Sequence, residues 1–384
     1  MSAFVSTTRR TVLAGLVAGG LVPGAALAQD SFKFGLAMPL SGSQALYGAD
    51  QVKAAEWAVA KINAEGGING KKLEMISLDT QGDPQLGIKA VNRLVSVDKV
   101  PAIVLAWSAV VKATAPIMND GKTLGLSVGA NSADVARLGD YVYTTYPLAD
   151  VDITAVANYA ATTMGKKKAA VVFINNESGV VAADVYKDAF TKAGGQVVAF
   201  EAYDPKATDW TGPLLKVRAA QPDIIHVQGV VGDIPQVIAQ MRQLGMNQTI
   251  SSYSAIYNPK FLEQLGKGAE GVIATSLAPG ADDAPAVKTY LERWAKEVGR
   301  EPNGLPYTQY LYDAAYVVAA VFKSLDDKKI PVTGENFRKE LLAVKTFELP
   351  LTGKLVVNDN HTVSKPVILM EVKDGKWTKK AVVN

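Results

Sequence analysis

The alternation of short apolar runs with stretches of helical periodicity is the feature that most constrains how this chain can fold. Phe32–Met38 predicts a strand, and apolar residues then recur at helical spacing from Val52 to Ile62. Further strands are expected at Leu73–Leu78, Ala102–Ala106 and Thr123–Val128, with a helix at about 84–97. Strands that alternate with helices are typical of parallel βαβ units, with helices on both faces of the sheet.

A second series of the same kind begins near residue 150. It predicts strands at Ala169–Ile174, Gln196–Glu201, Asp223–Val227 and Thr249–Tyr253. The segment from about 284 to 345 is mainly helical, and strands return at Lys354–Val357, Val367–Val372 and Trp377–Val382. Because no low-complexity linker separates the two series, we expect an α/β protein of two doubly wound lobes joined by several short crossovers.

The first 28 residues have the composition of an export signal. Arg9 and Arg10 precede an apolar run from Val12 to Val22, and Ala26-Leu27-Ala28 offers a cleavage site before Gln29. The run is shorter than the roughly 20 residues that span a bilayer, although a short membrane anchor is the alternative. Because Thr8–Leu13 also resembles the twin-arginine motif, the twin-arginine and the ordinary secretion routes both stay open.

The composition excludes several classes of function. The chain has no cysteine, which rules out disulfides, thiolate metal sites and cysteine nucleophiles. It has only two histidines, which argues against a multi-histidine metal site. A formal net charge of +3 without a clustered basic run does not indicate a nucleic-acid partner. The phosphate-binding, dinucleotide-binding and nucleophile-elbow motifs do not occur, so we expect no enzyme and no cofactor.

Several motifs, taken in order, resemble one known family over essentially the whole mature chain. Pro39–Gly48 is similar to the first ligand loop of the Leu/Ile/Val-binding family of periplasmic solute-binding proteins, and Ile62–Leu73 is similar to that family's turn into its second strand. The others are Asp79–Pro84, Asp98–Val100, Asp209-Trp210, Gln221–Ile225, Glu270–Val272 and Tyr312–Ala315. Each motif alone is weak, but their order and spacing are specific.

The resemblance implies the type I periplasmic-binding fold, with a mostly parallel sheet in each lobe and three crossovers between the lobes. Residues 29–148 and 277–350 would form the N-terminal lobe, and residues 149–276 and 351–384 the C-terminal lobe. The ligand would lie in the cleft between them. Open α/β sheets generally bind ligands beyond the carboxyl ends of their strands, where helix N-termini offer free N–H groups.

The resemblance also implies ligand contacts in the first lobe. Tyr47 would cover the ligand, and Ser108 would bind its carboxylate through the hydroxyl and local N–H groups; a plain helix N-cap is the alternative for Ser108. Trp107 is unusual at its position and could line the pocket or anchor its loop. Gly129, Ala130 and Asn131 end a strand where relatives place a small residue and a threonine, and an Asx-turn is the alternative for Asn131.

In the second lobe, the family's ligand-contact positions correspond to Ser178, Gln228, Gly229 and Tyr253. Relatives specific for amino acids carry an acid near Tyr253 that pairs with the ligand ammonium, and Ser252-Tyr253-Ser254 contains none. A buried ammonium without a carboxylate partner would be poorly compensated, so the ligand is expected to be a carboxylate with an apolar or aromatic body. Asp233 keeps a branched-chain amino acid open as the second choice. His226 is expected to be a core histidine.

The sequence therefore predicts a periplasmic solute-binding protein, monomeric, that captures a small carboxylate by hinge closure and delivers it to an ABC permease in the inner membrane. A ligand sensor for a membrane receptor would use the same fold, and the sequence does not separate the two. A two-carboxylate hydrolase is the remaining enzyme class that motifs alone leave open.

Overall fold

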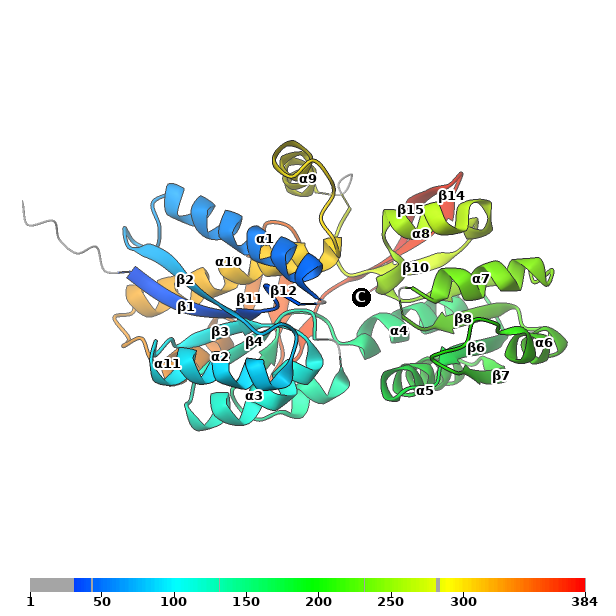
Figure 1. Cartoon of the computed structure of the whole chain (residues 1–384), viewed down its shortest axis with the longest axis horizontal. Helices are drawn as coiled ribbons and strands as arrows, with labels where there is room; N and C mark the ends of the chain where they lie inside the picture. The colour runs from blue at the N-terminus through cyan, green and yellow to red at the C-terminus, as the bar shows by residue number, and fades with distance from the viewer. Residues whose placement is uncertain (1–30, 43, 131, 231, 281–283, 384) are drawn as a thin grey trace, which may run out of the picture.

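The protein consists of two lobes that lie end to end (Figure 1). The computed structural model describes residues 31–42, 44–130, 132–230, 232–280 and 284–383. The predicted export signal at residues 1–28 lies outside this range. Within the described ranges, no helix combines the length and the apolar character that crossing a membrane requires.

The first lobe is built on a five-stranded parallel sheet with the strand order β2-β1-β3-β4-β5. Its strands are β1 (Ser31–Met38), β2 (Lys72–Asp79), β3 (Ala102–Leu105), β4 (Leu124–Ser127) and β5 (Val142–Thr144). The helices that connect them are α1 (Ala45–Ala64), α2 (Pro84–Ser96), α3 (Ser108–Asp120) and the short η1 (Ala133–Arg137). The predicted alternation of strands and helices is confirmed here, although β5 was not expected from the sequence.

Helices cover both faces of this sheet because neighbouring strand residues point to opposite sides. Leu36 belongs to the core cluster shared with α1 and α10 (Leu305–Asp327), whereas Ala37 belongs to the cluster shared with α2 and α3. Val104 and Ile103 in β3 divide in the same way. The apolar run at Phe34–Met38 in β1 and the apolar strand β3 are thus explained by burial on both faces.

After β10 the chain returns to the first lobe, where an aromatic contact joins α9 to α1. It contains α9 (Pro285–Glu297), α10, α11 (Gly334–Val344) and a small antiparallel sheet of β11 (Thr346–Leu349), β12 (Gly353–Val357) and β13 (Val363–Ser364). The Trp294 ring of α9 lies 4.9 Å from the Trp57 ring of α1, and the Arg293 guanidinium lies 4.0 Å from Trp57. These contacts bind α9 to the first lobe.

The second lobe has a seven-stranded sheet with the order β15-β14-β10-β9-β8-β6-β7. Its strands are β6 (Lys168–Ile174), β7 (Gln196–Tyr203), β8 (Ile224–Gln228), β9 (Thr249–Ser252), β10 (Ile273–Ser276), β14 (Val367–Lys373) and β15 (Lys376–Val383). Its helical segments are α4 (Ala149–Asn158), η2 (Tyr159–Thr163), α5 (Glu177–Lys192), α6 (Thr211–Ala219), α7 (Ile234–Gln243), η3 (Ser254–Ile256), α8 (Pro259–Leu265) and η4 (Gly266–Ala269). Only β14 and β15 join the sheet antiparallel, and β10 was not expected from the sequence.

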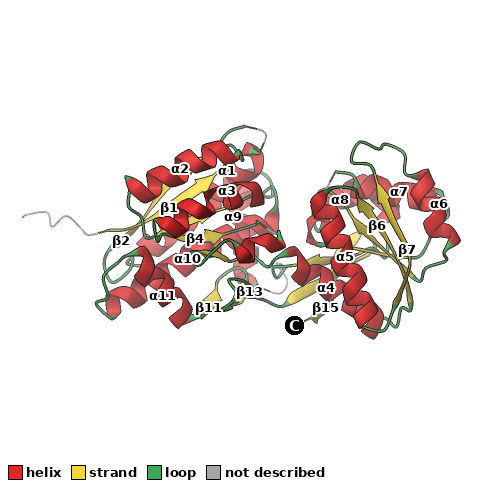
Figure 2. Cartoon of the chain, turned by 90° about the horizontal axis from the view of Figure 1, so that it is seen from below, coloured by secondary structure: helices red, strands yellow, loops and turns green. Residues whose placement is uncertain are grey.

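The chain passes between the lobes three times, after β5, after β10 and after β13, as Figure 2 shows from below. The boundary predicted between residues 350 and 351 falls inside the small antiparallel sheet, because β11 pairs with β12. Near the third passage, Lys365 donates hydrogen bonds to Thr352, whose N–H and hydroxyl both donate to the buried Asp313 carboxylate of α10. This buried network fixes the start of the third crossover to the first lobe.

Candidate functional site

A cavity of about 740 Å³ lies between the two lobes. The first lobe contributes residues of α3 and η1 and the residue before η1, and the second lobe contributes residues of α4 and α5 and of the ends of β6, β8 and β9. The contributing strands reach it at their carboxyl ends, where the loops of parallel sheets are free to bind ligands. The cleft that the fold predicts is therefore present.

The N-terminus of α3 opens onto this cavity. Ser108 is the first residue of the helix, and no side chain caps it. The first N–H that bonds within the turn is that of Val111, to the Trp107 carbonyl, so the N–H groups of residues 108–110 have no partner among the described residues. Such a helix end carries partial positive charge and free donors, which suits an anion.

Trp107 directly precedes α3 and has an unusual backbone conformation. Its φ of 65° lies in the left-handed region, which residues other than glycine rarely adopt. Its ring is half-buried against the core of the first lobe and is not part of the cavity wall. Of the two roles left open by the sequence, the geometry favours Trp107 as the anchor of the loop.

Lys112 and Asp134 form an ion pair on the same wall. The Nζ–Oδ2 distance is 2.6 Å, and the Lys112 ammonium holds the pKa of the Asp134 carboxyl below its usual value. Sequence reasoning did not select either residue. Lys112 follows Ser108 by four positions, so helical spacing alone could have indicated that the two share a face.

The second lobe faces this polar wall with a largely apolar one. Val181, Ala182 and Val185 of α5 line the cavity together with Ile174 at the end of β6. Asn176 lines it too and caps α5, since its side chain accepts from the Gly179 N–H at 2.8 Å. The predicted residue Ser178 lies beside them and donates to the Asn176 side chain.

Gln228 reaches the cavity from the end of β8 and is connected to His226. The His226 ring is fully buried, 3.4 Å from Gln228 Oε1 and 3.2 Å from Ser251 Oγ, and it stacks on Tyr186. Burial lowers the pKa of His226 to about 3. The prediction of a satisfied core histidine is therefore confirmed.

Gly229 lies between the cavity and the half-buried carboxyl group of Asp233. A Cβ at Gly229 would lie 2.2 Å from Tyr203 Oη and 2.5 Å from Asp233 Oδ1, so any side chain there would require Tyr203 or Asp233 to move. Tyr203 donates to Asp233 Oδ2 at 2.7 Å, and burial raises the pKa of Asp233. Asp233 does not line the cavity, which weakens its candidacy as an ammonium partner in this conformation.

A carboxylate does lie at the end of β9, although the local sequence contains none. Asp152 of α4 accepts from the Ser254 N–H at 3.1 Å and from the Thr275 hydroxyl at 2.9 Å. It is buried and does not line the cavity, and burial raises its pKa. Asp150, two residues earlier, is exposed and does line the cavity. Both acids belong to α4, which precedes β9 by about 100 residues in the sequence. Motifs near Tyr253 therefore could not reveal that these acids lie close to it in the fold.

Five of the predicted site residues line the cavity: Ser108, Ser178, Gln228, Gly229 and Tyr253. Tyr253 also donates to the Gly229 carbonyl at 2.8 Å. Gly129 and Ala130 lie beyond the wall, where Gly129 contacts Tyr307 and Ala130 is buried in the core. Asn131 lies outside the described residues. The roles of these residues remain predictions.

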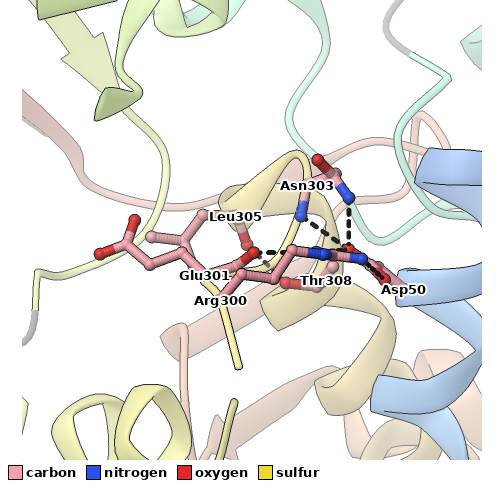
Figure 3. Close-up of polar contacts among 6 residues, drawn as sticks. All are labelled: Asp50, Arg300, Glu301, Asn303, Leu305 and Thr308. Carbon is pink, nitrogen blue, oxygen red and sulfur yellow. Dashed lines mark hydrogen bonds and ion pairs between the residues drawn. The ribbon is translucent and has the colours of Figure 1, made fainter. Parts of the chain in front are cut away.

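Tyr47 is an exposed residue in the first turn of α1 and does not line the cavity. Its ring lies beside Gly304, at the start of α10. One turn further on, Asp50 accepts two hydrogen bonds from Arg300 and two from Asn303, which fixes the loop before α10 (Figure 3). Tyr47 thus lies beside this hydrogen-bonded loop and does not line the cavity in this conformation.

The chain is similar to known proteins over most of its length. The family model described as "Periplasmic binding protein" matches residues 31–376. A "Leu/Ile/Val-binding protein homolog 3" from Brucella melitensis is 26% identical over 321 residues, covering 79% of this chain and 86% of the relative.

Two solved structures are similar along nearly the whole chain. One is the substrate-binding protein of a branched-chain amino acid transporter from Streptococcus pneumoniae in complex with isoleucine, with TM-score 0.75, 23% identity and coverage of 92% of this chain and 99% of that one. The other is a solute-binding protein of an ABC transporter from Rhodopseudomonas palustris in complex with 3,4-dihydroxybenzoic acid, with TM-score 0.75, 21% identity and coverage of 92% and 97%. This likeness confirms the predicted two-lobed fold.

Proposed function

This chain belongs to the periplasmic binding protein family, and from that membership we propose that it is the solute-binding component of an ABC importer, with a small carboxylic acid of apolar or aromatic body as its ligand. The acid binds in the cleft between the lobes. Closure around a hinge then brings both walls onto the ligand, because contacts from both lobes are made together only in the closed form. The inner-membrane permease takes the ligand from the closed form.

The free N-terminus of α3 is the observation that carries this proposal. Among the described residues, the N–H groups of residues 108–110 have no partner. Ser108 and Ala109 line the cavity, and their N–H groups together with the Ser108 hydroxyl can bind the oxygens of a carboxylate. The helix dipole adds a favourable interaction with negative charge. The carboxylate of the ligand therefore binds at this helix end.

The apolar wall of α5 supports the second half of the proposal. Val181, Val185 and Ile174 offer aliphatic surface opposite α3, and Tyr253 adds an aromatic ring. Burial of an apolar body against these side chains contributes about 25 cal/mol per Å² of surface removed from water. A solved relative in complex with 3,4-dihydroxybenzoic acid and another in complex with isoleucine both fit a carboxylate with such a body.

An amino acid is the second candidate ligand, and Asp150 favours it. This acid lines the cavity from the second lobe and has no ion pair among the described residues. It replaces Asp233 as the first candidate for an ammonium partner. The relatives named for Leu, Ile and Val point in the same direction.

Isothermal calorimetry on refolded, ligand-free protein tests the proposal. We compare a carboxylic acid, its amide and the matching α-amino acid, for example 4-methylpentanoate, 4-methylpentanamide and leucine. The acid is expected to bind and the amide to bind far more weakly. Removal of one hydrogen bond to a charged group costs roughly 1.5–3 kcal/mol, so Ser108→Ala is expected to weaken acid binding by about tenfold to a hundredfold.

Ser96→Ala is the matched control, because Ser96 is an exposed helical serine that does not line the cavity and whose hydroxyl donates to the Asn92 carbonyl of its own helix. It should leave the affinity unchanged. If leucine binds much more tightly than 4-methylpentanoate, and Asp150→Asn abolishes that preference, the amino-acid function replaces the one proposed.

A further inference from the structure

A second cavity, of about 190 Å³, lies beside the passage of the chain from β10 to α9. It shares no lining residue with the larger cavity of about 740 Å³ described above. Both lobes contribute to its wall: α9, α10 and the loop before α10 in the first lobe, and β10, β15 and residues 257–258 in the second. The proposed function makes no use of this second cavity.

The wall of the second cavity is mainly apolar. Its aliphatic side chains are those of Ala278, Pro279, Val287, Leu291, Leu305 and Pro306, and the Trp377 ring adds an aromatic surface. Among the described residues that line the cavity, none is Lys, Arg or His, and the single acid, Glu301, is exposed. The interior of this cavity therefore suits an uncharged molecule.

Gln309 brings a polar group to this apolar wall. It follows Leu305 by four positions on α10, so the two side chains share the helix face that lines the cavity. Gln309 is only 2% exposed, yet its side-chain amide has no hydrogen-bond partner among the described residues. Because buried amides nearly always have a partner, this amide is available to a molecule inside the cavity.

Two other polar side chains of the wall are already used by the fold. The Ser276 hydroxyl donates to the Ala278 carbonyl at 2.7 Å. The Asn258 side chain accepts from the Phe261 N–H and donates to a backbone carbonyl, which caps α8. Gln309 differs from both, since no turn or helix end depends on its amide.

We propose that the second cavity is a binding site for a small uncharged molecule with an apolar body and one amide or hydroxyl group. Amide and hydroxyl groups both donate and accept, as the Gln309 side chain does, so ligand and Gln309 can exchange two hydrogen bonds. The apolar body of the ligand contacts the aliphatic wall and Trp377. This inference does not depend on which ligand the larger cavity binds.

The volume of the cavity supports this class of ligand. An apolar cavity of about 150 Å³ is known to take up benzene, so about 190 Å³ has room for a ring with one small substituent. Water is a poor filling for most of this volume, because each buried water needs two to four polar partners.

The charges of the wall exclude other classes. A carboxylate would find no cation among the described lining residues, and its charge would be buried without a partner. An ammonium could pair with Glu301, but that side chain is exposed, and attraction between exposed charges is weak.

NMR of the mature protein labelled with ¹⁵N at its tryptophans provides the test. The chain has five tryptophans, so the indole N–H signals are few, and Trp377→Phe identifies the signal of Trp377 at the second cavity. The probes are benzamide and benzyl alcohol, which are uncharged, and benzylamine, which is a cation. The uncharged probes are expected to shift the Trp377 signal saturably and to bind more tightly than benzylamine.

Two variants connect this binding to the cavity. Gln309→Met keeps the length of the side chain and is expected to weaken benzamide binding by about tenfold, through the loss of two neutral hydrogen bonds. It should not lower the melting temperature of the free protein, because the amide that it removes has no partner in the fold. A merely structural Gln309 would give the opposite result.

Gly280→Leu fills the cavity and is expected to abolish benzamide binding. A Cβ at Gly280 would have Tyr257 Oη, 3.7 Å away, as its nearest contact, and the φ of Gly280 is not in the left-handed region, so a side chain can be added. Gly212→Leu is the matched control, since Gly212 is an exposed glycine of α6 with open space around it. It should leave benzamide binding unchanged.

Each contrary outcome overturns the inference in a recognisable way. If neither uncharged probe shifts the Trp377 signal saturably, the cavity holds water only. Benzamide binding that survives both Gln309→Met and Gly280→Leu lies elsewhere in the protein, and tighter binding of benzylamine refutes the uncharged class. The proposed function is judged separately by the affinity for carboxylic acids, which Gln309→Met should leave unchanged.

Discussion

The buried histidine of the second lobe makes the stability of the protein depend on pH in a defined window. His226 lies in β8, is fully buried, and contacts Ser251, Gln228 and the Tyr186 ring. Burial lowers its folded-state pKa from the usual 6.5 to about 3. Below pH 6.5 the unfolded chain binds a proton that the folded protein does not, so the free energy of unfolding falls as pH falls.

The size of the effect follows from the two pKa values. Full stabilisation is present above pH 6.5, and the loss continues down to about pH 3. One pH unit in this window is worth about 1.36 kcal/mol, so at pH 4.5 the His226 contribution has decreased by about 2.7 kcal/mol. For a domain of this size that corresponds to a decrease in melting temperature of roughly 5–11 °C.

Urea unfolding at a series of pH values between 7.0 and 4.5 measures the loss, with the native protein compared with His226→Gln. The difference in free energy of unfolding between the two proteins is the relevant quantity, because the acidic groups that titrate in the same range are common to both and cancel. This difference should change by about 2.7 kcal/mol over the window, in the direction that favours the variant at low pH.

Tyr186→Phe is the control, since it keeps the aromatic ring against His226 and should therefore retain the pH dependence of the native protein. A difference between the native protein and His226→Gln that stays constant from pH 7.0 to 4.5 would refute the reasoning. It would mean that His226 takes up its proton in the folded state, through opening of the sheet near β8.

Two further substitutions test the frame of the cavity. Asp50→Ala removes the four hydrogen bonds from Arg300 and Asn303 and should cost about 2–3 kcal/mol in thermal or urea unfolding, against less than about 0.5 kcal/mol for the exposed control Lys61→Ala. Burial alone would raise the Asp50 pKa, but the hydrogen bonds from Arg300 and Asn303 outweigh burial and hold the pKa below 3.8. The stabilisation that the Asp50 carboxylate provides is therefore present above pH 3.8 and is lost as pH falls below it. Gly229→Ala should lower the melting temperature and weaken acid binding in calorimetry, because its Cβ would displace Tyr203 from Asp233, whereas Gly232→Ala, with open space around it, should do neither.

The fold was largely predictable because burial on both faces leaves a strong signal in sequence. The runs at Phe34–Met38 and Ala169–Ile174 contain no charged or polar side chain, as expected for strands covered on both sides. β5 and β10 have only three and four residues, and polar Thr144, Thr275 and Ser276 interrupt their apolar character. Their place in the sheets is set by neighbouring strands instead of by their own composition, so the sequence does not distinguish them from loops.

The cavity wall was predictable where a residue ends a strand and less so where it lies on a helix. Gln228 is the last residue of a strand, and Gly229 and Tyr253 directly follow strands; strand ends can be predicted from the apolar pattern. Lys112, Val181 and Val185 come from helix faces, whose orientation toward the cavity depends on the packing of the two lobes. Asp150 and Asp152 reach the cleft region because α4 begins the second lobe directly after the first passage of the chain between the lobes.

Acids from elsewhere in the chain lie near the cavity, so the lack of an acid at Ser252-Tyr253-Ser254 does not by itself decide the ligand class. Asp152 supplies negative charge at that position in space, but its hydrogen bonds to Ser254 and Thr275 commit it to the frame of the second lobe. Asp134 is committed to Lys112. Among the described acids of the cavity wall, Asp150 therefore has the fewest structural commitments, and it stands at the first turn of α4, where the helix dipole already stabilises its charge. Asp150 already interacts favourably with the N-terminus of α4, and an ammonium ligand would have to replace part of that interaction. A carboxylate ligand, by contrast, would bind N–H donors at the start of α3 that have no other partner among the described residues.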